Sequence, residues 1–148
     1  MDPDIALSDA LEQAVAETFS GMAFLDALPT EPCGFDRTDR RFVVEVRAAG
    51  THRIVLILPL PVCRTIVENI HACSMDELSA SDVDDCLLET LNVLAGTFGR
   101  FYWGDVSRYK LTLPRDAAGL PDESAERGSD TYWFDAEGQP FAVYAAEA

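Results

Sequence analysis

The strongest constraint on how this chain folds is an amphipathic segment between residues 82 and 100. Apolar residues recur there every three or four positions, which is the periodicity of an α-helix that buries one side. These residues are Val83, Leu87, Leu88, Leu91, Leu94, Ala95 and Phe98. Ser79 or Ser81 can cap the N-terminus of this segment through its hydroxyl oxygen. The sequence therefore predicts a helix that packs on a core through one face.

The other periodic segments predict an α+β fold. Residues 8–28 and 61–72 have helical periodicity. Shorter runs have the composition of strands, at 41–49, 51–59, 109–113, 131–135 and 141–145. Residues 115–130 have no apolar period and predict an exposed loop. We therefore expect a single domain over residues 1–148, in which helices pack on an antiparallel sheet.

The charge of the chain is strongly negative. Its 148 residues include 11 Lys and Arg against 26 Asp and Glu, which gives a formal net charge of −15. Phosphate backbones and anionic lipids repel such a surface, so we expect no nucleic-acid partner and no membrane partner. The apolar runs are too short to span a bilayer, and the N-terminal residues lack the basic start of a signal peptide. These features predict a cytoplasmic protein.

Cysteine and histidine residues are few and widely spaced. The four cysteines form no C-x-x-C pair, and the two histidines belong to no metal-binding motif. The sequence also lacks a P-loop and a G-x-S-x-G motif. We therefore expect no metal and no cofactor in this chain, and we expect Cys63 and Cys86 to be buried reduced thiols.

A polar stripe lies opposite the apolar face of the 82–100 helix. At about 100° per residue, Asp85, Glu89, Asn92 and Gly96 fall close together on this face. Gly96 costs about 1 kcal/mol of helix propensity relative to alanine, but it allows a bulky group to come close. A polar stripe of this kind is most often a solvated surface, so periodicity alone assigns it no function.

The spacing of the stripe is more specific than its polarity. The pattern Asp85-x3-Glu89-x2-Asn92-x21-Pro114 resembles the signature of the CheC/CheX/FliY family, and its single complete occurrence resembles CheX-like members. The resemblance extends over nearly the whole chain in the order of helices and hairpins. It implies an α+β fold with a pseudo-twofold αββα-type repeat.

A weaker copy of the pattern lies in the first predicted helix. The segment that begins at Glu17 aligns without a gap with the segment that begins at Glu89. Ser20, however, stands where the second copy has Asn92, and Phe42 stands where constant spacing would place the matching proline. We therefore interpret Glu17 and Ser20 as a degenerate first site without activity.

The resemblance implies dephosphorylation of a CheY-like response regulator, which carries its phosphoryl group on an aspartate. Asn92 would orient the attacking water, and Glu89 would form a salt bridge with the active-site lysine of the regulator. Asp85 would contribute to the interface, and Pro114 would support the site. The Mg²⁺ ion expected in such a reaction would be held by the regulator and not by this chain.

Further contacts are expected beyond the two proposed catalytic residues. Gly96 ends the stripe, and Trp103 falls on the same face if the helix continues, so both are candidate partner-binding residues. Members of the CheX type are homodimers, and the resemblance implies that this chain also forms a homodimer. Pairing of two sheets would cover the exposed edges of their strands.

Two other functions are compatible with the same residues. The stripe could bind a response regulator, or another signalling or flagellar protein, without catalysis. Alternatively, Asp85 and Glu89 could form a two-carboxylate hydrolase. The hydrolase hypothesis is weaker, because no neighbouring element of the sequence supplies a metal ligand or a substrate pocket. Retention of Asn92 favours catalysis over binding alone.

Overall fold

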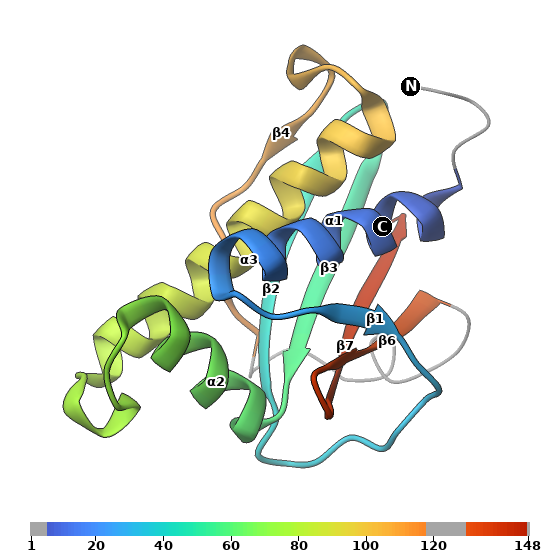
Figure 1. The fold of residues 1–148 in the computed structure, drawn as a ribbon. Coiled ribbons are helices and arrows are strands. Elements are labelled where there is room, and N and C mark those ends of the chain that lie inside the picture. The colour runs from blue at the N-terminus through green and yellow to red at the C-terminus, as the bar shows by residue number, and fades with distance from the viewer. Residues whose placement is uncertain (1–5, 118–129, 148) are drawn as a thin grey trace.

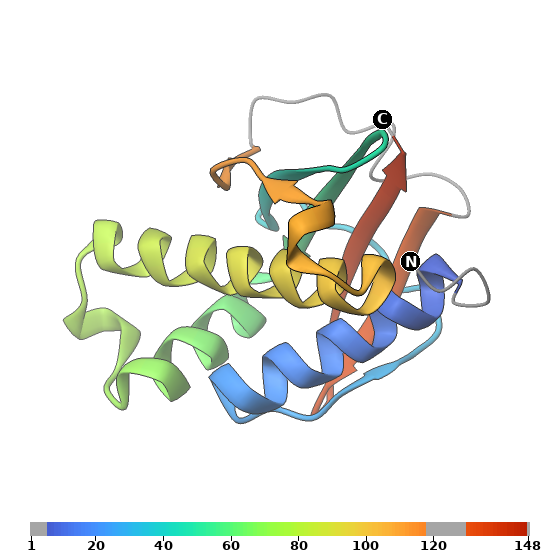
Figure 2. The same cartoon turned by 90° about the horizontal axis from the view of Figure 1, so that it is seen from above.

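Three α-helices lie on one face of an antiparallel sheet in the computed structural model, which describes residues 6–117 and 130–147 (Figures 1 and 2). The helices are α1 (Leu7–Ala23), α2 (Leu60–His71) and α3 (Ala80–Trp103). The strands are β1 (Ala27–Pro29), β2 (Arg40–Arg47), β3 (Thr51–Leu58), β4 (Lys110–Leu111), β5 (Arg115–Asp116), β6 (Thr131–Ala136) and β7 (Gln139–Glu147). The short 3-10 helices Met75–Glu77 and Val106–Arg108 precede and follow α3. The expected α+β class is confirmed.

The order of the strands has an internal twofold symmetry. The sheet runs β1-β6-β7-β3-β2-β4, and β5 also pairs with β2. Exchanging α1-β1-β2-β3 with α3-β4-β6-β7 reverses this order and reproduces it. The two halves of the chain are therefore related by a pseudo-twofold axis, as the resemblance implied. The helices α1 and α3 of the two halves pack side by side (Figure 2).

Alternation along the strands divides the core between the two faces of the sheet. Phe42, Val44 and Val46 of β2 face the helices and join the larger buried cluster, which includes the apolar sides of α1 and α3. Val43 faces the other way and belongs to a smaller cluster, against which Phe35 packs. Because the apolar side of α3 packs on the larger cluster, the polar side of the helix points away from the core.

The first helix ends earlier than the sequence predicts. α1 stops at Ala23, and Phe24 takes a left-handed conformation with φ of 58°. The Leu25 N–H then donates to the Phe19 carbonyl oxygen at 3.0 Å, which closes the end of the helix. The following residues pair with β6 as β1. The prediction of a helix over 8–28 is wrong at this end, because a strand of 3 residues is too short to show a period.

The second half of the chain also differs in detail from the predicted elements. The Ser79 hydroxyl accepts a hydrogen bond from the Asp82 N–H at 3.0 Å and caps α3, which continues beyond residue 100 to Trp103. The strand predicted over 109–113 is limited to β4, and residues 115–116 form β5 where a loop was expected. The rest of that predicted loop, residues 118–129, lies outside the described residues. The hairpins predicted within 41–59 and 131–145 are confirmed.

Three further expectations concern the buried cysteines, a metal site and a membrane-spanning segment. Cys63 and Cys86 are buried free thiols, as predicted, and burial raises the pKa of Cys63 to about 12. Among the described residues, no group of three or more His, Cys, Asp or Glu side chains is placed to hold a metal ion. None of the helices in that part of the chain is long and apolar enough to cross a bilayer.

Candidate functional site

The helix α3 turns the stripe of Asp85, Glu89, Asn92 and Gly96 away from the core. Asp85 and Glu89 are exposed, whereas Asn92 and Gly96 are partly buried. Fully buried leucines on the opposite side of the helix fix this orientation. Within the described part of the chain, the side chains of Glu89 and Asn92 make no hydrogen bond or ion pair. Both polar groups are therefore available to a partner.

Arg40 anchors the N-terminal half of α3 to the sheet. Its Nη2 atom lies 3.0 Å from Asp84 Oδ1 and 3.1 Å from Asp116 Oδ2. Burial lowers the pKa of Arg40, but the hydrogen bonds with the two carboxylates outweigh this effect and raise the pKa above its usual value. Since Arg40 belongs to β2 and Asp116 to β5, these contacts tie α3 to the strands beneath it.

Pro114 occupies a bulge at the edge of the sheet. Leu111 pairs with Val46 of β2, and Arg115 pairs with Val43. Three residues lie between Leu111 and Arg115 but only two lie between their partners, so this segment has one extra residue. The Glu45 N–H donates there to Thr112 Oγ1 at 2.9 Å instead of to a backbone oxygen. Proline fits a bulge because it has no N–H to offer to the ladder. Next to it, Leu113 is 88% exposed.

The segment that carries Leu113 and Pro114 runs alongside α3 (Figure 1). At one end, Leu111 lies next to Gly96 of α3. At the other end, the contacts of Arg40 hold β5 near the start of α3. The residues between these two anchors therefore lie beside the stripe. Leu113 is a candidate contact that the sequence analysis missed, and only its position next to the signature proline could have indicated it.

The close approach predicted at Gly96 occurs one turn later, at Gly99. A Cβ atom on Gly96 would have Leu111 Cδ1 as its nearest neighbour at 3.9 Å, which is an ordinary contact. A Cβ atom on Gly99 would lie 2.4 Å from Tyr109 Cε2. The Tyr109 hydroxyl donates to the Gly96 carbonyl oxygen at 3.0 Å and fixes the ring against α3. A partner contact at Gly96 stays a prediction, since its neighbours here belong to the same chain.

Trp103 lies in the core and not on the surface of α3. The residue is 7% exposed. Its ring meets His52 edge-on at 5.2 Å between centroids, and it stacks with Tyr109 at 5.7 Å. The expected partner contact at Trp103 is therefore wrong. The segment that follows α3 folds back and places Tyr109 against the indole ring.

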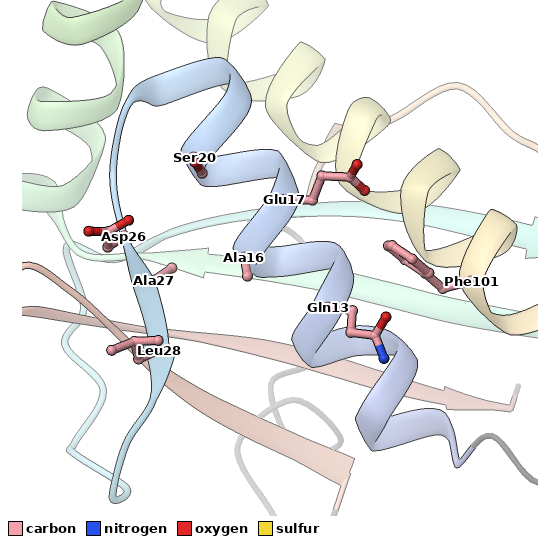
Figure 3. Close-up of a pocket in the computed structure, with 8 residues that line it drawn as sticks. All are labelled: Gln13, Ala16, Glu17, Ser20, Asp26, Ala27, Leu28 and Phe101. Carbon is pink, nitrogen blue, oxygen red and sulfur yellow. The ribbon is translucent and has the colours of Figure 1, made fainter.

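Glu17 and Ser20 lie on the exposed face of α1, at the pseudo-twofold equivalent of the stripe. They line a hollow of about 700 Å³ together with residues of β1 and with Phe101 of α3 (Figure 3). The carboxylate of Glu17 points toward α3 and forms an ion pair with Arg100. Glu17 is therefore engaged within the chain, whereas Glu89 has no such partner among the described residues.

The structure places the counterpart of the signature proline differently from the sequence alignment. The pseudo-twofold relates β4, which precedes Pro114, to β1, whereas Phe42 lies in β2. The strand β1 itself ends at Pro29. The expectation that Phe42 stands at the proline position is therefore wrong. Constant spacing fails because α3 extends farther beyond the aligned segment than α1 does.

Several solved structures of chemotaxis proteins share this architecture. No family model matches the sequence, and no curated protein matches it significantly. The chemotaxis protein CheX from Desulfovibrio desulfuricans superposes with a TM-score of 0.74 at 15% identity, over 97% of this chain and 100% of that chain. CheX from Vibrio vulnificus gives a TM-score of 0.74 at 13% identity, over 95% and 97% of the two chains. A CheX–CheY–BeF3–Mg²⁺ complex from Borrelia burgdorferi gives 0.69 at 14% identity, over 96% and 97%.

The chain has the CheC/CheX/FliY fold. In this fold, four of the predicted site residues come together: Asp85, Glu89 and Asn92 share one exposed face of α3, and Pro114 lies in the segment beside it. The two carboxylates can attract a cationic group, and the carboxamide offers both a donor and an acceptor. The arrangement can therefore pair with a positive charge and orient a small polar molecule at the same time.

Proposed function

We propose that this protein is a CheX-like phosphatase of a phosphorylated CheY-like response regulator. The observation that carries the proposal is the joint projection of Glu89 and Asn92 from α3, with both polar groups unengaged among the described residues. The fold supports it, because a structure with this fold contains CheX together with CheY, BeF3 and Mg²⁺. The spacing from Asp85 to Pro114 supports it independently through the sequence.

In the proposed reaction, Asn92 acts on the water. Its carboxamide accepts a hydrogen bond from the water and holds it in line with the bond between phosphorus and the aspartyl oxygen. As water attacks, a new P–O bond forms and the P–O bond to the aspartyl oxygen breaks, so that the aspartate leaves as a carboxylate. The proton lost by the water passes to the phosphate or to solvent, and inorganic phosphate is released. A neutral amide suits this position, since a carboxylate would repel the phosphoryl group. The Mg²⁺ held by the regulator neutralises the charge on the phosphoryl oxygens.

Glu89 acts on the regulator and not on the water. Its exposed carboxylate would pair with the active-site lysine of the regulator, and this charge-assisted contact would set the position of Asn92 one turn further along α3. Asp85 extends the same acidic face. Leu113 offers an apolar contact beside it, since this side chain is 88% exposed. Together these groups would form a small interface with a polar centre.

The competing function is binding without hydrolysis, because the same exposed face would serve both. The two functions are separated by measuring the decay of phosphorylated CheY-like regulators with and without the protein. We expect the wild-type protein to accelerate the decay, and Glu89→Ala to reduce the acceleration at subsaturating concentration. Glu31→Ala, which removes another exposed carboxylate far from α3 in sequence, is the matched control. Complex formation without acceleration would favour the binding function and reject the phosphatase.

A further inference from the structure

A second hollow lies at the edge of the sheet, where β2 ends and β4 begins. It has a volume of about 470 Å³, and it is lined by Arg47, Ala48 and residues 107–112. Small-molecule sites in proteins commonly have volumes of this size. Among the residues that the structure describes, the lining contains the cations Arg47, Arg108 and Lys110 and no carboxylate. We call it the basic hollow.

This concentration of positive charge is unusual for the chain. Only 11 of the 148 residues are Lys or Arg, against 26 acidic residues, and Lys110 is the single lysine. Three of these few cations therefore line one hollow, while the rest of the molecule carries a large excess of negative charge. The sequence alone did not show this grouping, because β2 and β4 are far apart along the chain.

Two of the cations lie directly opposite each other on neighbouring strands. Arg47 and Lys110 are register partners in the antiparallel pair of β2 and β4, so their side chains leave the same face of the sheet. Like charges in this arrangement destabilise a sheet. A charged edge strand also discourages pairing with other chains, but that role requires neither two opposed cations nor a hollow. A bound anion would remove the repulsion.

The described carboxylates near these cations, Glu45 and Asp105, do not line the hollow. The nearest partner of Arg47 is Glu45, and its Oε1 atom lies 3.7 Å from Nη2, at the outer limit of an ion pair. Close to Arg108, Asp105 accepts the Ser107 N–H at 2.9 Å, and this hydrogen bond lowers the pKa of Asp105. In the described part of the chain, Arg108 and Lys110 form no ion pair, although the charge of Arg108 also helps to lower the pKa of Asp105. Their charge is therefore available to a ligand.

We propose that the basic hollow binds a compact, multiply charged phosphate anion, such as a diphosphate group. Three cations suit a ligand with more than one negative charge, and the Thr112 hydroxyl can donate to it, because its oxygen already accepts the Glu45 N–H. A long polyanion such as a nucleic acid would extend over the acidic surface and be repelled. The proposal does not depend on the phosphatase function.

The single lysine provides a direct test. Reductive methylation with ¹³C-formaldehyde labels Lys110 and the N-terminal amine only, and it keeps their positive charge. We expect pyrophosphate, added at constant ionic strength, to shift the Lys110 dimethylamine resonance saturably and to leave the N-terminal resonance in place. Adenosine diphosphate is the second ligand: tighter binding than pyrophosphate would identify a nucleotide, and equal binding would identify the diphosphate group alone.

Variants distinguish a specific binding site from general attraction between charges. Arg108→Ala should weaken the binding of pyrophosphate to Lys110 by about tenfold or more, as expected from the loss of one charge-assisted contact. Arg37→Ala removes an exposed cation outside the hollow and should leave the affinity unchanged. A shift that never saturates, an equal shift of the N-terminal resonance, or unchanged affinity in Arg108→Ala would overturn the proposal.

Discussion

At the scale of single residues, one substitution and one difference in pairing separate the two copies of the pattern. Asn92 offers a planar amide with a donor and an acceptor, where the first copy has only the hydroxyl of Ser20. Glu89 is exposed and unpaired among the described residues, whereas Glu17 is neutralised by Arg100. These differences confine the proposed activity to α3 and leave α1 with a structural role.

The first copy should therefore be dispensable for regulator dephosphorylation. Glu17→Ala and Ser20→Ala are expected to leave the acceleration within about twofold of wild type, the range usual for exposed positions. Loss of the ion pair with Arg100 should cost at most about 1 kcal/mol of stability, because both side chains are largely exposed. Regulator decay and urea unfolding measure the two effects. A tenfold loss of acceleration would show that the first copy takes part in the reaction.

The titration of His52 affects the free energy of unfolding. It lies against the rings of Tyr102 and Trp103. Burial lowers the pKa of its imidazole from 6.5, and the charge of Glu147, which raises the pKa, offsets only part of this effect. The unfolded chain therefore binds a proton at a higher pH than the folded chain does. The free energy of unfolding should be greatest above pH 6.5 and fall as the pH drops from there to the lowered pKa.

The variant His52→Gln removes this titration. Its free energy of unfolding, measured with urea from about pH 5 to pH 7.5, should depend less on pH than that of the wild type. Proton NMR of the His52 ring would give the pKa directly. A value above 6.5 in the folded protein would contradict the expected direction.

At the scale of elements, the position of α3 depends on the segment that follows it. Tyr109 packs against Gly99, donates to the Gly96 carbonyl oxygen, and stacks with Trp103 at the end of the helix. The bulge at Pro114 then brings the chain alongside the stripe. The proposed site therefore lies on a helix whose position is fixed by the segment that follows it. The close contact between Gly99 and Tyr109 is essential to this packing.

Two glycines three residues apart in α3 should respond oppositely to the same substitution. Gly99→Ala would place a Cβ atom 2.4 Å from the Tyr109 ring, and overpacking of this kind costs about 1–3 kcal/mol of stability. Gly96→Ala meets its nearest atom at 3.9 Å and should gain up to about 1 kcal/mol from helix propensity. Urea unfolding of both variants measures the difference. Equal effects would contradict the contact assigned to Tyr109.

The sequence predicted long, periodic elements well and short or folded-back segments poorly. The helix over 82–100 and the hairpin within 41–59 have enough turns or alternations to show their period. The strands β1 and β5 are too short to do so. The helical wheel placed Glu89 and Asn92 correctly on one face, but it could not show that Tyr109 covers Trp103. That contact depends on a segment outside the helix.

At the scale of the whole molecule, the pseudo-twofold leaves two comparable edges on the sheet. One edge is β1, where Leu28 is 64% exposed, and the other is formed by β4 and β5. The basic hollow lies at the second edge, and the hollow beside Glu17 lies at the first. The two edges of this repeated fold therefore present different surfaces.

The exposed edge strands also bear on assembly. We predict a homodimer, because pairing of edge strands would cover unpaired backbone groups and an exposed apolar side chain such as Leu28. Size-exclusion chromatography with light scattering should give twice the mass of one chain. A monomer mass at every protein concentration tested would contradict this prediction.

The most direct test of the proposed function is the effect of Asn92→Ala on a saturated complex. A phosphorylated CheY-like regulator is mixed with excess wild-type or variant protein, and the release of inorganic phosphate is followed while binding is confirmed in the same samples. If Asn92 orients the attacking water, the variant should bind the regulator but lose about 100-fold of the acceleration. Full acceleration by Asn92→Ala would contradict the mechanism.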